Sequence, residues 1–397
     1  MVVVVVGVAV VVVVVVVGVR ETNNEVCVKV QLNDELIAIA LGSPGPKGLR
    51  GLPVLFWGDP GSAKTTILES AVAELGDPCI TLTPQHDETT YGIVPFVDAE
   101  HVRTPAHEWT KQFASRGVVI LDDLTSHSGP VHAAQLRLIT HRETGSAKLG
   151  QDVAVVGIAN MCSQASNGRP LSAAMANRFI HLVTDLPWTS VAQYLLDMGV
   201  AKSDRLRALI ARIHFSWDRA FEIERRRMAG FVVARGSAMD AADENESFDA
   251  TIKASSRSIE LCVRAITAAR LVEAEHLIPA FIGGSIGRGH AHAYVEYAAK
   301  QDLPSDEEIM TTWAPRYGQA DVAFVVLGRL TSMIETAPAT EIIARYWRLV
   351  EQITRSSSDG GAQISPDVVV PSAKRLAKLS HLPPYGVPSR ILREVIL

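Results

Sequence analysis

Short apolar runs alternate with longer amphipathic segments through the first half of the chain. The apolar runs have the length of β-strands, and the amphipathic segments repeat their apolar positions every three to four residues, as a helix does. The predicted strands are 25–32, 52–57, 79–83, 117–121, 153–159 and 179–183, and the predicted helices are 65–75 and 130–141. Continuous apolar strands that alternate with helices are typical of a parallel sheet covered on both faces, so the pattern predicts an α/β fold.

After Trp188 the pattern changes to helices alone. The helical period runs through 191–198, 205–233 and 256–275, while 237–249 is acidic and polar and is expected to be a loop. From residue 276 onward the chain has helical segments broken by proline and glycine. We therefore expect five parts: a Val-rich extension at 1–20, a lead-in at 21–48, an α/β core at 49–188, an all-α region at 189–300 and a mostly helical C-terminal region at 301–397.

Composition limits the classes of partner. The chain has 397 residues, 47% of them hydrophobic, and a net charge of -5, so no general basic field is available to attract nucleic acid. The one short basic run, 225–227, is flanked by Glu222 and Glu224 and is interpreted as a solvated helix face. The four cysteines form no CxxC pair and have no zinc-like spacing to histidine, which favours reduced thiols in a cytoplasmic protein.

The N-terminal segment 2–19 contains only Val, Gly and Ala. As a helix it would span about 27 Å, close to the minimum for a membrane, but Val and Gly are poor helix formers. Three interpretations stay open: a membrane anchor, a low-complexity extension that is not part of the working protein, and a buried or aggregating strand. The expected localisation remains cytoplasmic, with anchoring through this segment as the alternative.

A glycine-rich loop lies between the strand 52–57 and the helix 65–75. Its sequence, GDPGSAKTT, has the context that a phosphate-binding loop requires, and its candidate nucleotide-binding residues are Gly58, Asp59, Pro60, Gly61, Ser62, Ala63, Lys64, Thr65 and Thr66. Lys64 would neutralise the β- and γ-phosphates, and the Thr65 hydroxyl would bind Mg²⁺. Ala63 replaces the usual glycine, which is acceptable if the residue has helical dihedral angles. The alternative is a turn that happens to precede Lys-Thr.

Polar side chains follow two of the other strands. VVILDDL ends in Asp122, expected to bind Mg²⁺, and Asp123, expected to orient or deprotonate water. VAVVGIAN ends in Asn160, which could hold the lytic water. The alternatives are a solvated junction between strand and turn for the carboxylates and a simple turn residue for the amide.

These segments resemble the AAA+ ATPases, in particular the MoxR-like, dynein-related branch. GDPGSAKT is similar to that branch's GxPGxAKT form, 121–145 is similar to its Walker B region, and 157–182 is similar to the segment that carries sensor 1 and the arginine finger. The resemblance implies a P-loop core with a helical lid, ATP bound between them with Mg²⁺, and an ATPase. It also implies that Asn160 is sensor 1, that Arg178 is an arginine finger reaching a neighbour's γ-phosphate, and that Arg257 is sensor 2. Salt bridges at helix ends are the alternative for both arginines.

The same resemblance implies a biological role. It predicts a hexameric ring that remodels a partner protein, often one with a von Willebrand A domain, and the loop 91–98 would face the pore or that partner. The family usually has Glu where this chain has Asp123, so a nucleotide-gated switch with weak hydrolysis is a second hypothesis. A DNA-dependent motor is disfavoured by the near-neutral charge, and no nucleic acid is expected.

Overall fold

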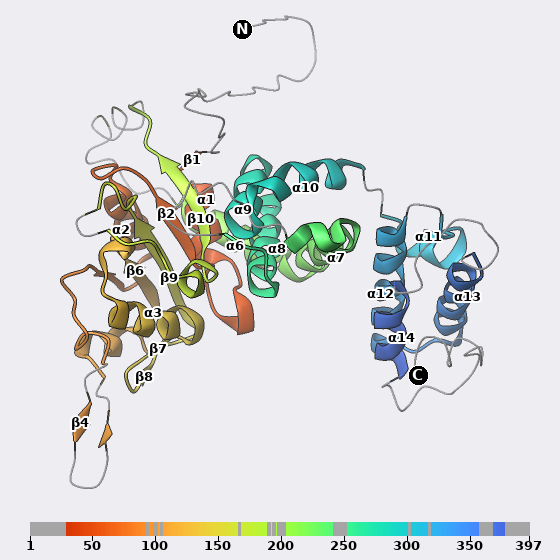
Figure 1. The fold of residues 1–397 in the computed structure, drawn as a ribbon, viewed down its shortest axis with the longest axis horizontal. Helices are drawn as coiled ribbons and strands as arrows, with labels where there is room; N and C mark the ends of the chain where they lie inside the picture. Colours follow the sequence, from red (N-terminus) through yellow and green to blue (C-terminus); the bar gives the residue numbers. More distant parts are fainter. Residues whose placement is uncertain are drawn as a thin grey trace, which may run out of the picture.

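The fold is an α/β core followed by two helical regions (Figure 1). The computed structural model describes residues 29–92, 95–97, 102–103, 106–165, 168–188, 192, 196, 204–240, 252–300, 303–316, 319–356 and 368–377. The Val-rich segment 2–19 and nearly all of the predicted helix 191–198 lie outside the described residues. No described helix is both long and apolar enough to cross a membrane.

The core contains a six-stranded sheet in the order β1-β10-β2-β9-β6-β3, and every neighbouring pair is parallel. The strands are β1 (Val30–Gln31), β2 (Val54–Trp57), β3 (Cys79–Leu82), β6 (Arg116–Leu121), β9 (Asp152–Ala159) and β10 (Ile180–Asp185). All the predicted strands are present, with small changes in the bounds of most; of the first, predicted over 25–32, residues 25–28 lie outside the described residues. The strand β9 lies between β2 and β6, so the residues that follow these three strands meet at one edge of the sheet.

Alternate residues of the strands pack into two separate cores, as expected for a sheet covered on both faces. Val54 and Phe56 belong to the core with α1 (Asp34–Gly42), α2 (Lys64–Leu75) and the helices between residues 205 and 300. Leu55 and Trp57 belong to the other core, with η2 (Glu108–Phe113), α3 (Gly129–His141) and α4 (Ala173–Ala176). The predicted α/β class and the two predicted core helices are confirmed.

The helix α1 lies within the lead-in 21–48, where the sequence pattern predicts no helix. Leu36 to Gly42 is buried along its whole length, so the sequence has no polar face to reveal a helical period. A start signal is present, because Asn33 caps the Leu36 amide through its side chain (3.0 Å) and is followed by two acidic residues.

The helices after the core are α6 (Arg205–Phe215), α7 (Trp217–Arg235), α8 (Ser256–Leu271), α9 (Ile278–Ile286) and α10 (Arg288–Lys300). The single helix predicted over 205–233 is wrong, because the chain breaks at Ser216. The helix predicted over 256–275 ends early, at Leu271, and a separate short η5 (Glu275–Leu277) follows. In the predicted loop 237–249, residues up to 240 form the short η4 (Gly236–Asp240), and the rest lies outside the described residues.

The helix α9 packs directly on the sheet. A Cβ atom at Gly284 would lie 1.9 Å from the carbonyl oxygen of His181 in β10, so only glycine permits this approach. The helical region and the α/β core therefore share one continuous apolar cluster.

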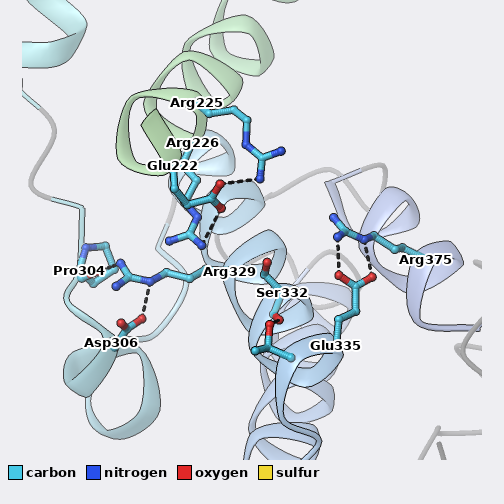
Figure 2. Close-up of polar contacts among 10 residues, drawn as sticks. Glu222, Arg225, Arg226, Pro304, Asp306, Arg329, Ser332, Glu335 and Arg375 are labelled. Carbon is cyan, nitrogen blue, oxygen red and sulfur yellow. Dashed lines mark hydrogen bonds and ion pairs between the residues drawn. The ribbon is translucent and has the colours of Figure 1, made fainter. Parts of the chain in front are cut away.

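The C-terminal region is helical, as predicted, and has its own apolar core. It consists of α11 (Asp306–Thr311), α12 (Ala320–Thr336), α13 (Thr340–Ser356) and α14 (Val370–Ala377), and α12 packs along α7. Figure 2 shows ion pairs in this area, with Arg226 on Glu222 (2.8 Å) within α7 and Arg329 on Asp306 between α12 and α11. These pairs are partly exposed, so the apolar contacts carry most of the packing energy.

Two short strands, β4 (Phe96–Val97) and β5 (Val102–Arg103), pair in antiparallel fashion within and just after the predicted loop 91–98. In Figure 1 this hairpin lies beyond β7 (Glu143–Thr144) and β8 (Ala147–Lys148), at the far end of the core from β1. The side chain of Val97 is 74% exposed. The expected role of the loop 91–98, to face a pore or a partner, stays a prediction.

Candidate functional site

The glycine-rich loop connects the end of β2 to the start of α2. Gly61 and Ala63 both have left-handed backbone angles, with φ of 77° and 55°. The expectation that Ala63 has helical dihedral angles is therefore wrong. Glycine adopts this region without a steric penalty, whereas alanine is strained there by about 1–2 kcal/mol. Ala63 is the last residue before α2, so the strain is located where the loop turns into the helix.

The amides of this loop are available to an anion. Within the described residues, no hydrogen bond uses the amides of Gly61, Ala63, Lys64 or Thr65, and Gly61 and Ala63 are exposed. The last two amides belong to the first turn of α2, whose N-terminus carries positive potential. Free amides at a helix start after left-handed residues form a concave anion site, which fits a polyphosphate chain.

Lys64 lies inside the loop. Its Nζ atom is 2.9 Å from the carbonyl oxygens of both Gly58 and Asp59, 3.0 Å from Ser62 Oγ and 3.3 Å from Asn160 Oδ1. Burial lowers the pKa of this amine, while the nearby Asp122, Asp59 and Asp123 oppose that shift. The side chain is only 6% exposed, so its charge is directed toward the loop rather than toward bulk water.

Thr65 and Asp122, the two residues expected to bind Mg²⁺, lie in direct contact. The Thr65 hydroxyl donates to Asp122 Oδ2 at 3.0 Å, and burial raises the pKa of that carboxyl. The described residues contain no cluster of three or more His, Cys, Asp or Glu side chains able to hold a metal. One carboxylate and one hydroxyl suit Mg²⁺, which usually takes its other ligands from phosphates and water. The donor set therefore fits a magnesium–nucleotide complex better than a protein-only metal site.

Asp123 and Asn160 complete this edge of the sheet. Asn160 Nδ2 donates to Asp123 Oδ1 at 3.3 Å, and the same side chain contacts Lys64 through its oxygen. Asp123 has left-handed backbone angles, with φ of 48°, and its amide donates to Asp122 Oδ1 at 2.9 Å. The structure thus brings Lys64, Thr65, Asp122, Asp123 and Asn160 together, as the order of strands predicts.

Arg178 and Arg257 lie elsewhere. Arg178 lies just before β10. Ile180, at the start of β10, pairs with Val54 at the start of β2, whereas the glycine-rich loop follows the end of β2. Arg178 therefore lies at the edge of the sheet opposite the loop. From Val54 to Gly58 the chain advances about 13 Å at about 3.3 Å per residue. Arg178 Nε donates to Thr140 Oγ1 at 3.0 Å and its Nη1 to the carbonyl oxygen of Ala174, which directs it away from its own loop.

Arg257 shares a cavity of about 250 Å³ with Arg178. Burial lowers the pKa of Arg178, and the charge of Arg257 adds to that shift. Lys47 and Arg142 also line the cavity, with Glu260 as the one acidic side chain among its described lining residues. In the described contacts, neither predicted arginine touches the glycine-rich loop of its own chain.

No described hydrogen bond joins residues 204–240 or 252–300 to the glycine-rich loop 58–66. Arg207 of α6 donates to the carbonyl oxygen of Glu74 (2.7 Å), near the C-terminal end of α2 and far from Lys64. The expectation that a nucleotide lies between core and lid stays a prediction. The segment between β10 and α6 lies almost wholly outside the described residues.

Several supporting residues carry no signal in the sequence. Thr184 donates to the Trp57 carbonyl oxygen (2.9 Å) and lies against Gly58, whose missing side chain permits that contact. Thr125 donates to the Asn160 carbonyl oxygen (3.1 Å), and Gln164 donates to Asp59 Oδ1 (3.0 Å). His127 contacts the Asp122 carbonyl oxygen (2.9 Å), and burial lowers its pKa to about 4. Single polar residues after a motif give no periodic signal that could identify them.

His181 supports the strand that leads into the loop. Its Nε2 donates to the Ala176 carbonyl oxygen (2.9 Å), and its Nδ1 accepts from Trp57 Nε1 (3.0 Å), so the ring is neutral. Burial lowers the pKa of His181 to about 4 from an ordinary value of 6.5. Protonation would therefore break the contact to Trp57.

Acid should destabilise the fold through His181. Its pKa is lower in the folded state, so the unfolded chain binds a proton first and stability is lost as the pH falls from about 6.5 toward 4. At pH 5 the expected loss is about 2 kcal/mol of unfolding free energy relative to pH 7. Urea unfolding of the wild type and of His181→Gln at both pH values measures this difference. An equal pH dependence in the two proteins would contradict the assignment.

No protein-family model matches this chain, and no curated protein matches it at a significant level. The functional interpretation therefore depends on the motifs and on the geometry described above.

Proposed function

We propose that this protein is an ATPase of the AAA+ type, of the MoxR-like branch, which binds Mg-ATP at the loop 58–66. The observation that carries the proposal is the convergence of Lys64, Thr65, Asp122, Asp123 and Asn160 at one edge of a parallel sheet, beside free loop amides. The alternative of unrelated turns does not account for direct contacts among residues that are as far as 96 positions apart in the sequence.

Each residue has a role that follows from its position. The loop amides and Lys64 would hold the phosphate chain, and Thr65 and Asp122 would hold Mg²⁺. When bound, the metal ion would neutralise charge on the phosphate oxygens. Asp123 would accept a proton from the attacking water, and Asn160 would orient that water, since its amide lies between Asp123 and Lys64.

The proposed active unit is a ring of subunits, hexameric by the family resemblance. Arg178 and Arg257 lie at the opposite edge of the sheet from the loop, so they would complete the site of the next subunit. A rigid, always charged guanidinium suits the developing charge on a transferred phosphoryl group. The remodelling of a partner, of the von Willebrand A-domain kind, is proposed from the resemblance alone.

Calorimetric titration of the full chain with Mg-ATP tests the proposal directly. We expect saturable heat at one site per chain, and ADP should compete for it. If millimolar Mg-ATP gives no heat of association, the site does not bind a nucleotide and the proposal fails.

The second candidate function is a nucleotide-gated switch that hydrolyses ATP slowly. It is favoured by Asp123, which is one methylene shorter than the glutamate usual in the family and is held by Asn160 (3.3 Å). Asp123→Glu should bring the carboxylate closer to the attacking water and raise kcat by about tenfold or more. Steady-state phosphate release by the variant and the wild type measures this. An unchanged kcat would remove the case for a switch based on this residue.

A further inference from the structure

A buried chain of hydrogen bonds connects the Asp122–Asp123 turn to the base of the β4–β5 hairpin. His127 Nε2 lies 2.9 Å from the Asp122 carbonyl oxygen, and His127 Nδ1 lies 2.6 Å from Gln135 Nε2. Gln135 Nε2 also lies 2.9 Å from the Tyr91 hydroxyl oxygen. The three side chains are 3%, 0% and 1% exposed, so water does not compete for these contacts.

The direction of the hydrogen bonds is fixed by the carbonyl at one end. A carbonyl oxygen only accepts, so His127 Nε2 must carry a proton, and the Nδ1 atom of the neutral ring must accept. Gln135 then donates one hydrogen from its NH₂ group to His127 and the other to the Tyr91 oxygen. Only this arrangement satisfies all three contacts, and the three side chains therefore behave as a unit.

The chain of contacts acts on one peptide group. His127 holds the carbonyl of the Asp122–Asp123 peptide, and the amide of the same peptide donates to Asp122 Oδ1 at 2.9 Å. Because the peptide is planar, holding both ends fixes its orientation. Asp123 follows this peptide in a left-handed conformation, which a non-glycine residue keeps only when its surroundings enforce it.

The other end of the chain is anchored where the hairpin begins. The carbonyl oxygen of Tyr91 accepts from Thr144 Oγ1 (2.8 Å), and the carbonyl oxygen of Thr90 accepts from Trp109 Nε1 (3.0 Å). Beyond these anchors the chain runs to β4 of the hairpin, at the far end of the core (Figure 1). The two carbonyl contacts fix the backbone of Thr90 and Tyr91, so the Tyr91 hydroxyl is held at its end of the chain of contacts.

We propose that His127 is a positioning residue for Asp123, and that Gln135 and Tyr91 hold the His127 ring in the orientation that this role requires. This inference rests on the proposed ATPase function. Neither His127 nor Gln135 touches the phosphate loop in any described contact, so their effect is expected on turnover and not on nucleotide affinity.

The test uses His127→Ala and Tyr91→Phe in the full chain. We expect kcat for ATP to fall about tenfold in His127→Ala, as for other residues that orient a catalytic group, and about threefold in Tyr91→Phe. The affinity for Mg-ATP should stay within about twofold of the wild type, and the double variant should be no slower than His127→Ala. Tyr346→Phe is the matched control, because it also removes a buried hydroxyl bonded to one side chain, Ser372 (2.8 Å), but in the C-terminal region.

Wild-type kcat in both variants would overturn the inference. A loss of Mg-ATP affinity as large as the loss of kcat would also overturn it, and so would additive effects on kcat in the double variant. If His127→Ala does not fold, Tyr91→Phe decides alone, since it leaves the ring in place. A wild-type protein that binds no Mg-ATP overturns the proposed function itself, which separates the two failures.

Discussion

Replacing Lys64 with methionine should abolish nucleotide binding without unfolding the protein. Lys64 Nζ lies within 3.3 Å of four acceptor oxygens in and beside the loop, so the loss removes the only cation in this cradle among the described contacts. We expect the affinity for Mg-ATP to fall at least about 100-fold, which corresponds to about 2.7 kcal/mol, and turnover to become undetectable. Titration calorimetry of the variant, under the conditions used for the wild type, measures the loss.

The stability of the same variant gives an independent result. Burial lowers the pKa of Lys64, which shows that the fold holds this charge at a cost in solvation. Methionine has a similar length and no charge, so the unfolding free energy should change by less than about 1 kcal/mol. Lys148→Met, at an exposed lysine on β8, is the matched control and should keep full affinity. Equal affinity in Lys64→Met and the wild type would exclude the loop as the binding site.

The sheet and the edge that carries the candidate site are predictable from the sequence because both leave regular signals. Buried parallel strands appear as continuous apolar runs, and the polar residues that end them are expected to lie at one edge. The sequence pattern alone therefore locates Lys64, Asp122, Asp123 and Asn160. The pattern does not give the contacts of Asn160 with Lys64 and Asp123, which depend on β9 lying between β2 and β6.

The incorrect expectations have physical causes of a different kind. The helix α1 is buried on all sides, so it carries no amphipathic pattern. Alanine favours right-handed helical backbone angles, so the sequence predicts them at Ala63, but the loop holds this residue in the left-handed region. His127, Gln135 and Tyr91 are separated in sequence and are brought together by tertiary packing alone. Such residues become visible only when the fold is known.

Arg178→Ala should reduce hydrolysis by about 1,000-fold and leave binding of Mg-ATP intact. The guanidinium is held on the far side of the sheet from its own loop by Thr140 and Ala174, so it does not contribute to that loop's affinity. Phosphate release across a series of protein concentrations should show a steep rise for the wild type and none for the variant. Arg137→Ala removes a nearby surface arginine paired with Glu143 (2.8 Å) and should behave as the wild type.

Mixing two inactive proteins provides the sharper form of this test. Arg178→Ala chains keep a complete loop, and Lys64→Met chains keep a complete arginine edge. In a head-to-tail ring formed from equal amounts, about a quarter of the interfaces join an intact loop to an intact arginine. Activity should therefore reappear on mixing and increase with total protein. If the mixture stays inactive while both variants still assemble, Arg178 acts within its own subunit or not at all, and the geometry of opposite edges has no catalytic meaning.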